Sequence, residues 1–173
     1  MTGYRYLLDA NIFIEAKNRH YGFDFCPAFW DWLIAQNRAG TVASIKKVDG
    51  ELQAGKDELA DWAKTRGDGF FLSPDQAVLS AMRTVNDWAN NGKKEWYKPA
   101  AVKTFLAGAD CWLVAHALAH GCTVVTHERP ADTVAIIKIP NACDSLNVRC
   151  IDPYQMLQNE GARFVLGPGT EVA

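Results

Sequence analysis

Four acidic residues of the chain have the types and positions to do chemistry together: Asp9, Glu51, Asp110 and Glu128. Each is predicted to lie just after a strand or near the start of a helix. Taken singly, a carboxylate at such a position caps the helix or is favoured by the helix dipole. In a parallel sheet, however, the carboxyl ends of the strands lie along one edge, where ligands bind. Two interpretations stay open, four separate helix residues or one shared site.

A shared site would need a counterion. Two carboxylates about 4 Å apart repel each other by about 4 kcal/mol at an effective dielectric constant of about 20. Three or four of them therefore stay together only with a cation or with bound protons. Oxygen ligands select hard divalent ions, so the expected cofactor is Mg²⁺ or Mn²⁺. Such an ion activates water and neutralises a phosphodiester during in-line attack, which makes hydrolysis of a nucleic acid the expected chemistry.

Strands and helices alternate along the part of the chain that must position these acids. Strands are predicted over residues 4–8, 41–45, 123–128, 135–139 and 148–151. Helices are predicted over residues 12–17, 27–39, 46–66, 73–90, 109–119 and 153–159. The alternation favours a three-layer α/β fold, in which a central parallel sheet of about five strands has helices on both faces. We expect one domain over residues 1–160 and a flexible tail over residues 161–173.

Composition narrows the class of partner and the compartment. Lys plus Arg is 18 and Asp plus Glu is 20, so the net charge is −2 and a polyanion has to be bound by a local patch. The five cysteines form no CxxC pair and are expected to be reduced thiols of a cytoplasmic protein. No apolar run reaches the roughly 18 residues of a membrane helix, and no signal peptide is evident, so neither membrane insertion nor export is expected.

A local basic patch is present between residues 93 and 105. Lysines interleaved with aromatic residues suit a surface that follows phosphates and stacks unpaired bases. The residues predicted to bind RNA in this way are Lys93, Lys94, Trp96, Lys98 and Lys103. The alternative is a solvated connector that a few aromatic side chains anchor to the fold.

Three other patterns suggest sites but lack a required residue. Residues 50–57 nearly match the phosphate-binding loop GxxxxGK[ST], but Asp57 stands where a hydroxyl group must hold Mg²⁺. His116 and His120 are one helical turn apart, and zinc would need a third ligand near them. A phosphatase with Asp9 as nucleophile would need a second aspartate where Asn11 stands. We expect none of these three sites.

The ordered set of motifs resembles the PIN-domain nucleases, and within them the VapC-like toxins of bacterial and archaeal toxin–antitoxin pairs. The resemblance is carried over residues 4–128 by LDAN at residues 8–11, the acid of the second helical region, AD at residues 109–110 and TxE at residues 126–128. It implies an endoribonuclease that depends on Mg²⁺ or Mn²⁺. It also implies a homodimer and a cognate antitoxin that holds the enzyme inactive.

Position by position, the resemblance assigns roles to five residues. Asp9, Glu51 and Asp110 match the metal-binding acids of the family. Asn11 and Thr126 match the residues that orient those acids.

Glu128 departs from the family pattern, because an aspartate is usual there. The extra methylene displaces the carboxylate and puts a second metal position in doubt, and Asp132 is the candidate to replace it. Glu128 is still expected to help with metal or water. The departure also leaves open a PIN-like module that binds RNA or a protein without cleaving. Residues 18–25 and 68–103 are expected to elaborate the small core.

Overall fold

A five-stranded, all-parallel sheet forms the centre of the computed structural model, which describes residues 3–91 and 97–165. The strands are β1 (Tyr6–Leu8), β2 (Val42–Ile45), β3 (Phe71–Leu72), β4 (Thr123–Val125) and β5 (Cys150–Ile151). They lie in the order β3-β2-β1-β4-β5, so β1 is central. Every residue of β1, β2 and β4 is buried, as expected for a parallel sheet that is covered on both faces. The predicted three-layer α/β fold is confirmed.

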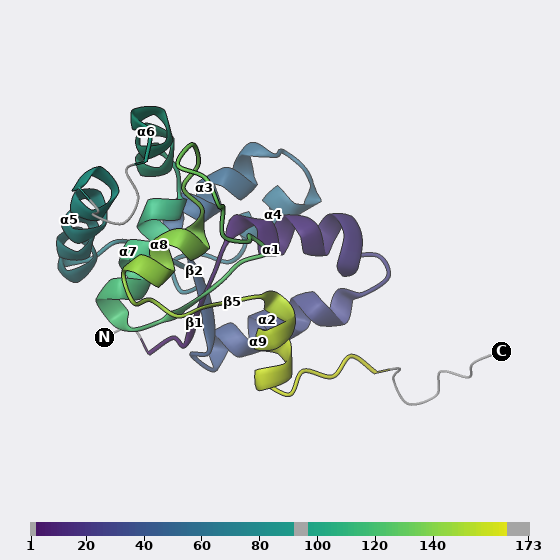
Figure 1. Ribbon diagram of the computed structural model, residues 1–173. Coiled ribbons are helices and arrows are strands. Elements are labelled where there is room, and N and C mark those ends of the chain that lie inside the picture. Colours follow the sequence, from purple (N-terminus) through teal and green to yellow (C-terminus); the bar gives the residue numbers. More distant parts are fainter. Residues whose placement is uncertain (1–2, 92–96, 166–173) are drawn as a thin grey trace.

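Helices cover both faces of this sheet (Figure 1). One face carries α5 (Gln76–Asn91), α6 (Pro99–Ala107), α7 (Asp110–His120) and α8 (Ile139–Ser145). The other carries α1 (Ala10–Glu15) with a π-helical turn (Ala16–His20), α2 (Pro27–Arg38) and α9 (Pro153–Asn159). Right-handed crossovers explain this division, because the chain reverses its direction across the sheet after β3. Within the described ranges, no helix is both long and apolar enough to cross a membrane.

Aromatic rings fill the space between the sheet and the helices that follow β1 and β2. The ring centroid of Phe13 on α1 lies 5.7 Å from that of Trp62 and 6.3 Å from that of Phe71 on β3. Trp62 in turn meets Trp30 of α2 at 5.0 Å. Large buried rings contribute most to such a core, so this cluster holds α1 in place and with it the acid that precedes α1.

The single helix predicted over residues 46–66 is wrong. The chain forms α3 (Lys46–Ala54) and α4 (Glu58–Lys64) instead. Lys56 has a φ of 53°, in the left-handed region that ends a helix. The Asp57 side chain then accepts a hydrogen bond from the backbone N–H of Ala60 (3.0 Å), which caps the new helix. Asp57 also pairs with Lys17 of the π-helical turn (2.7 Å), so a contact from elsewhere in the chain supports the break.

The strand predicted over residues 135–139 is also wrong, and β3 and α6 are elements that the prediction lacks. Residues 135–138 form no strand and α8 begins at Ile139, so the run is divided between a loop, where Ile136 is 48% exposed, and a helix start, where Ile139 is buried. Pro140 in the first turn of α8 suits a helix start, because that position needs no N–H donor. Of the predicted tail, residues 161–165 form no helix or strand and the remainder lies outside the described residues.

Candidate active site

Asp9 lies at the carboxyl end of the central strand and is 6% exposed. Leu8 of β1 pairs with Val125 of β4, so Asp9 and Thr126 leave the two strands side by side. The Thr126 hydroxyl donates to one carboxylate oxygen of Asp9 (2.8 Å), and the backbone N–H of Ala10 donates to the other (2.7 Å). Both oxygens of Asp9 are therefore fixed in direction before any ligand binds.

Asn11 and Thr126 tie β4 to the start of α1. The Asn11 amide donates to the Thr126 hydroxyl oxygen (2.9 Å), and its carbonyl oxygen accepts from the backbone N–H of His127 (3.1 Å). The same hydroxyl oxygen accepts from the backbone N–H of Glu128 (3.0 Å). Thr126 thus contacts Asp9 directly and Asn11 reaches Asp9 through it, as expected of residues that orient the acid.

The other acids lie near enough to Asp9 for their charges to act on one another. Burial is the main cause that raises the pKa of Asp9 from 3.8 to about 7, and the charges of Asp110 and Glu128 add to it, while the Thr126 hydrogen bond opposes it. Asp110 is the first residue of α7, and its pKa rises to about 6 through burial, Glu128 and Glu51. Glu51, exposed on α3, is linked to the cluster through Asp110. The structure therefore brings the four predicted acids to one edge of the sheet.

Glu128 differs from the other acids because it has a counterion. One of its carboxylate oxygens accepts from the Lys138 ammonium (2.5 Å), and the other accepts from the backbone N–H of Ile139, the first residue of α8 (2.9 Å). The hydrogen bond to Glu128 is the largest cause that raises the pKa of Lys138, and the charges of Asp110 and Asp9 also raise it. Lys138 therefore stays protonated and partly neutralises the acids.

Sequence reasoning misses Lys138. Its signal in the sequence is a single charge in an apolar run that ends before Pro140, a run whose pattern predicts a short strand. The loop that follows β4 instead turns back, and Asn141 holds it by accepting from the backbone N–H of Ala131 (2.9 Å). This turn is what brings Lys138 to Glu128, ten residues earlier in the chain.

The donor chemistry of the acids fits a hard dication. Burial and neighbouring negative charges raise the pKa of Asp9 and of Asp110, which makes both carboxyl groups harder to ionise. Within the described residues, neither forms an ion pair. Together with Glu51 they would hold such an ion by oxygen atoms alone. In the conformation seen, residues 3–91 and 97–165 contain no group of three His, Cys, Asp or Glu side chains arranged to bind a metal. Glu128 turns toward Lys138 and Glu51 toward solvent, so ligation requires side-chain rotation at this edge.

Other predicted site residues lie apart from the acids or outside the described ranges. Asp132 is exposed and is not among the main groups that raise the pKa of Asp9 or Asp110, so nothing places it in the cluster. Lys98 is exposed at the N-cap of α6, and its backbone N–H donates to the carbonyl of residue 134 (2.8 Å). Lys103 is exposed on α6 itself. Outside the described residues lie Lys93, Lys94 and Trp96.

The chain belongs to the family described as Domain of unknown function (DUF4411), which matches residues 6–164. The match runs from β1 past α9 and includes the four acids. No curated protein and no solved structure matches the chain.

Proposed function

We propose that this chain is a hydrolase, a divalent-metal-dependent endoribonuclease of the PIN-domain type. We further propose that it is the cytoplasmic toxin of a toxin–antitoxin pair, VapC-like, and is held inactive by a cognate antitoxin. The observation that supports the nuclease most is the gathering of Asp9, Glu51, Asp110 and Glu128, from four separate elements, at the carboxyl edge of a parallel sheet.

The proposed roles follow from how each acid is held. Asp9 and Asp110 are the fixed ligands, because Asp9 is locked by Thr126 and Asp110 begins a buried helix. Glu51 is exposed on α3 and approaches from the side of the solvent and the substrate. Bound Mg²⁺ or Mn²⁺ would supply charge neutralisation at the phosphodiester and a polarised water. Lys138 supplies a permanent positive charge beside the acids, which favours approach of a phosphate.

The choice of RNA as substrate rests on the resemblance to PIN-domain nucleases and on exposed lysines. Lys47 is exposed on α3, one helical turn before Glu51. Farther from the acids, Lys98 is exposed just before α6 and Lys103 on it. Such side chains can neutralise phosphates of a strand that crosses the acids. The antitoxin and a homodimer come from the resemblance alone.

The nuclease proposal is tested by incubating the purified protein with structured and single-stranded RNA in Mn²⁺. We expect cleavage that a chelator abolishes and that Asp9→Asn lowers by more than about 100-fold. Glu51→Gln should also lower it. Asp49→Asn is the matched control on α3, because Asp49 is buried and accepts from the Gln53 amide (2.7 Å), and this variant should keep its activity. Cleavage that survives both the chelator and Asp9→Asn would exclude the metal site.

The toxin proposal has a separate readout. Expression of the chain should arrest growth of a bacterial host, and Asp9→Asn should relieve the arrest while the protein accumulates to the same level. Size-exclusion chromatography with light scattering reports whether the chain is the expected homodimer. Growth that is equally slow with Asp9→Asn would contradict a toxin that acts by cleavage.

A non-cleaving module that binds RNA or a protein is the second candidate function. The observation that favours it is the engagement of Glu128 by Lys138 and by the backbone N–H of Ile139, which turns this carboxylate away from metal binding. In the assay above, RNA that stays intact but binds tightly, equally well with Asp9→Asn, would support this candidate over the nuclease.

A further inference from the structure

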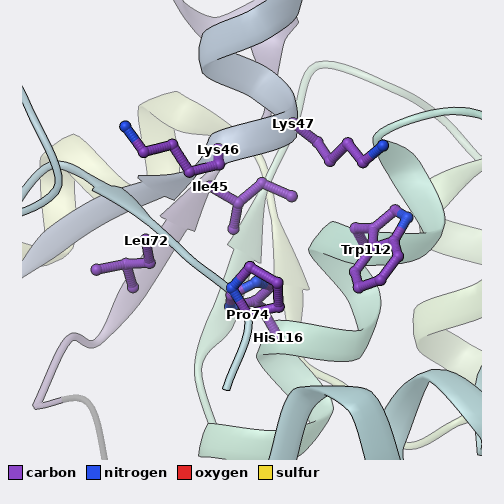
Figure 2. A pocket seen from close by; sticks show the side chains of 7 residues that line it. All are labelled: Ile45, Lys46, Lys47, Leu72, Pro74, Trp112 and His116. Atoms are coloured by element: carbon purple, nitrogen blue, oxygen red, sulfur yellow. The ribbon is translucent and has the colours of Figure 1, made fainter. Parts of the chain in front are cut away.

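A cavity of about 300 Å³ lies between α3, α7 and the carboxyl ends of β2 and β3. Its walls are mainly apolar and are formed by Ile45, Leu72, Pro74 and Trp112. Figure 2 shows the Trp112 indole on one side and Leu72 on the other, with Pro74 and His116 together at one end. The volume is at the lower end of the range of small-ligand pockets, so the cavity suits a small ligand with one ring or two fused rings.

The indole of Trp112 provides a surface on which a flat ring can stack. Trp112 is only half-buried, although its neighbours Cys111 and Leu113 on α7 are fully buried. The Lys47 ammonium lies 5.8 Å from the centre of the indole, so a positive charge accompanies the aromatic wall. Stacking on an aromatic side chain beside a cation is the usual way to hold an unpaired base next to its phosphate.

His116 lines one end of the cavity and is almost fully buried. The residue is 2% exposed, and within the described residues its Nδ1 is buried without a hydrogen-bond partner. Burial, followed by the charge of His120, lowers the pKa of His116 to about 4, so the ring is neutral and offers a single donor or acceptor at Nδ1. The neutral ring of His116 therefore adds no charge to the mainly apolar wall of the cavity.

The two histidines of α7 do not share a ligand here. His120 directs Nε2 to the carboxylate of Asp75 (3.2 Å), and the ring centroids of His116 and His120 are 6.5 Å apart. His120 is therefore engaged by Asp75, and the two rings are not arranged as a zinc pair within the described residues.

Two lysines line the end of the cavity away from His116 (Figure 2). Lys46 is paired with Asp68 (2.6 Å) and with Asp49 (3.7 Å). Lys47 is exposed and forms no ion pair with a carboxylate anywhere in the described parts of the chain. Its charge is available for the phosphate of a nucleotide whose ring enters the cavity.

The cavity and the acids are built on the same two helices. Lys47 precedes Glu51 by four residues on α3, which is about 6 Å along the helix axis. Residues four apart share a face of a helix, and the Lys47 ammonium lies 5.8 Å from the centre of the Trp112 indole. Lys47 therefore connects the cavity to Glu51, and one strand of RNA can reach both.

We propose that this cavity binds one unpaired nucleobase of an RNA strand, stacked on Trp112, with the adjoining phosphate bound by Lys47. The inference rests on the proposed nuclease and names the element that selects the base beside the cleaved bond. It is a recognition site, separate from the acids that carry the chemistry.

The test is calorimetric titration of the wild-type protein, in chelator, with AMP, GMP, CMP and UMP. Ribose 5-phosphate is the comparator without a base. We expect at least one mononucleotide to bind about tenfold or more tightly than ribose 5-phosphate, and a single-stranded tetranucleotide of that base to bind more tightly still. Trp112→Ala should weaken mononucleotide binding by about 5- to 100-fold, and Trp112→Phe, which keeps a ring, should retain most of it. Trp32→Ala, which truncates a half-buried tryptophan of α2, should leave binding unchanged.

The outcomes separate this inference from the proposed nuclease, because binding is measured without metal. If no mononucleotide binds better than ribose 5-phosphate, the nucleobase site is overturned, even where RNA is cleaved in Mn²⁺. If the tetranucleotide binds no more tightly than the mononucleotide, the RNA strand as ligand is overturned. Base-dependent binding that Trp112→Ala removes supports the cavity, even in a protein that cleaves no RNA.

Discussion

Replacing Asp9 by asparagine should stabilise the metal-free protein at neutral and alkaline pH, although it should abolish cleavage. The pKa of Asp9 is about 7 in the folded chain, against an ordinary value of 3.8. The folded state therefore holds more protons than the unfolded state between about pH 4 and pH 7. Because of this difference, the contribution of Asp9 to the free energy of unfolding falls as pH rises through that window and stays constant above it.

The magnitude follows from the same pKa. At about 1.4 kcal/mol for each pKa unit, ionised Asp9 lowers the free energy of unfolding by about 4 kcal/mol above pH 7. Asparagine removes this cost and can still accept from Ala10. Its amide, however, meets the Thr126 hydroxyl oxygen, which already accepts from Asn11 and from the backbone N–H of Glu128, at a cost of about 1 kcal/mol. The expected net gain near pH 8 is about 3 kcal/mol.

The assay is thermal unfolding of the wild type and of Asp9→Asn in chelator, from pH 4 to pH 8.5. The midpoint of Asp9→Asn should exceed that of the wild type by about 6–12 °C near pH 8, and the two should converge near pH 4. Asp110→Asn should act in the same direction with a smaller effect, because the pKa of Asp110 rises only to about 6. Mn²⁺ should raise the midpoint of the wild type at pH 8 and leave Asp9→Asn nearly unchanged. Parallel curves for the wild type and Asp9→Asn across this range would refute the reasoning from burial and repulsion.

Three further substitutions test neighbouring contacts. Thr126→Val removes the hydroxyl that donates to Asp9 and should lower the free energy of unfolding by about 1–3 kcal/mol, measured in urea. Lys138→Met removes the ammonium that pairs with Glu128 and should tighten Mn²⁺ binding roughly tenfold, measured by paramagnetic resonance; unchanged or weaker binding would contradict a repulsive role for this charge. Gly121→Ala should cost about 1 kcal/mol, because the φ of 70° after α7 is strained for alanine although its Cβ would meet no atom within 4 Å; an unchanged urea midpoint would contradict this.

Local patterns were sufficient where neighbouring residues decide the structure. The apolar runs that became β1, β2 and β4 lie near their predicted positions, and α9 occupies its predicted range. These segments are buried on both faces or have a helix start that their own residues define, as Pro153 does for α9. Local patterns failed at residues 55–57, where a pair between Lys17 and Asp57 crosses 40 positions of the chain. They failed again at residues 135–139, where an apolar run forms a loop and the first residue of α8, although Ile137 and Ile139 are buried.

The sequence by itself determined which side chains can do chemistry and predicted the parallel sheet, because residue types and hydrophobic periodicity are local properties. It left open whether Asp9, Glu51, Asp110 and Glu128 form one site or remain four separate helix residues. Only the tertiary structure decided that Thr126 locks Asp9 across 117 positions, that Lys138 pairs with Glu128, and that α3 and α7 enclose a cavity beside the acids. Such contacts depend on the order of strands in the sheet and on the path of one loop, and both arise from packing the whole chain at once.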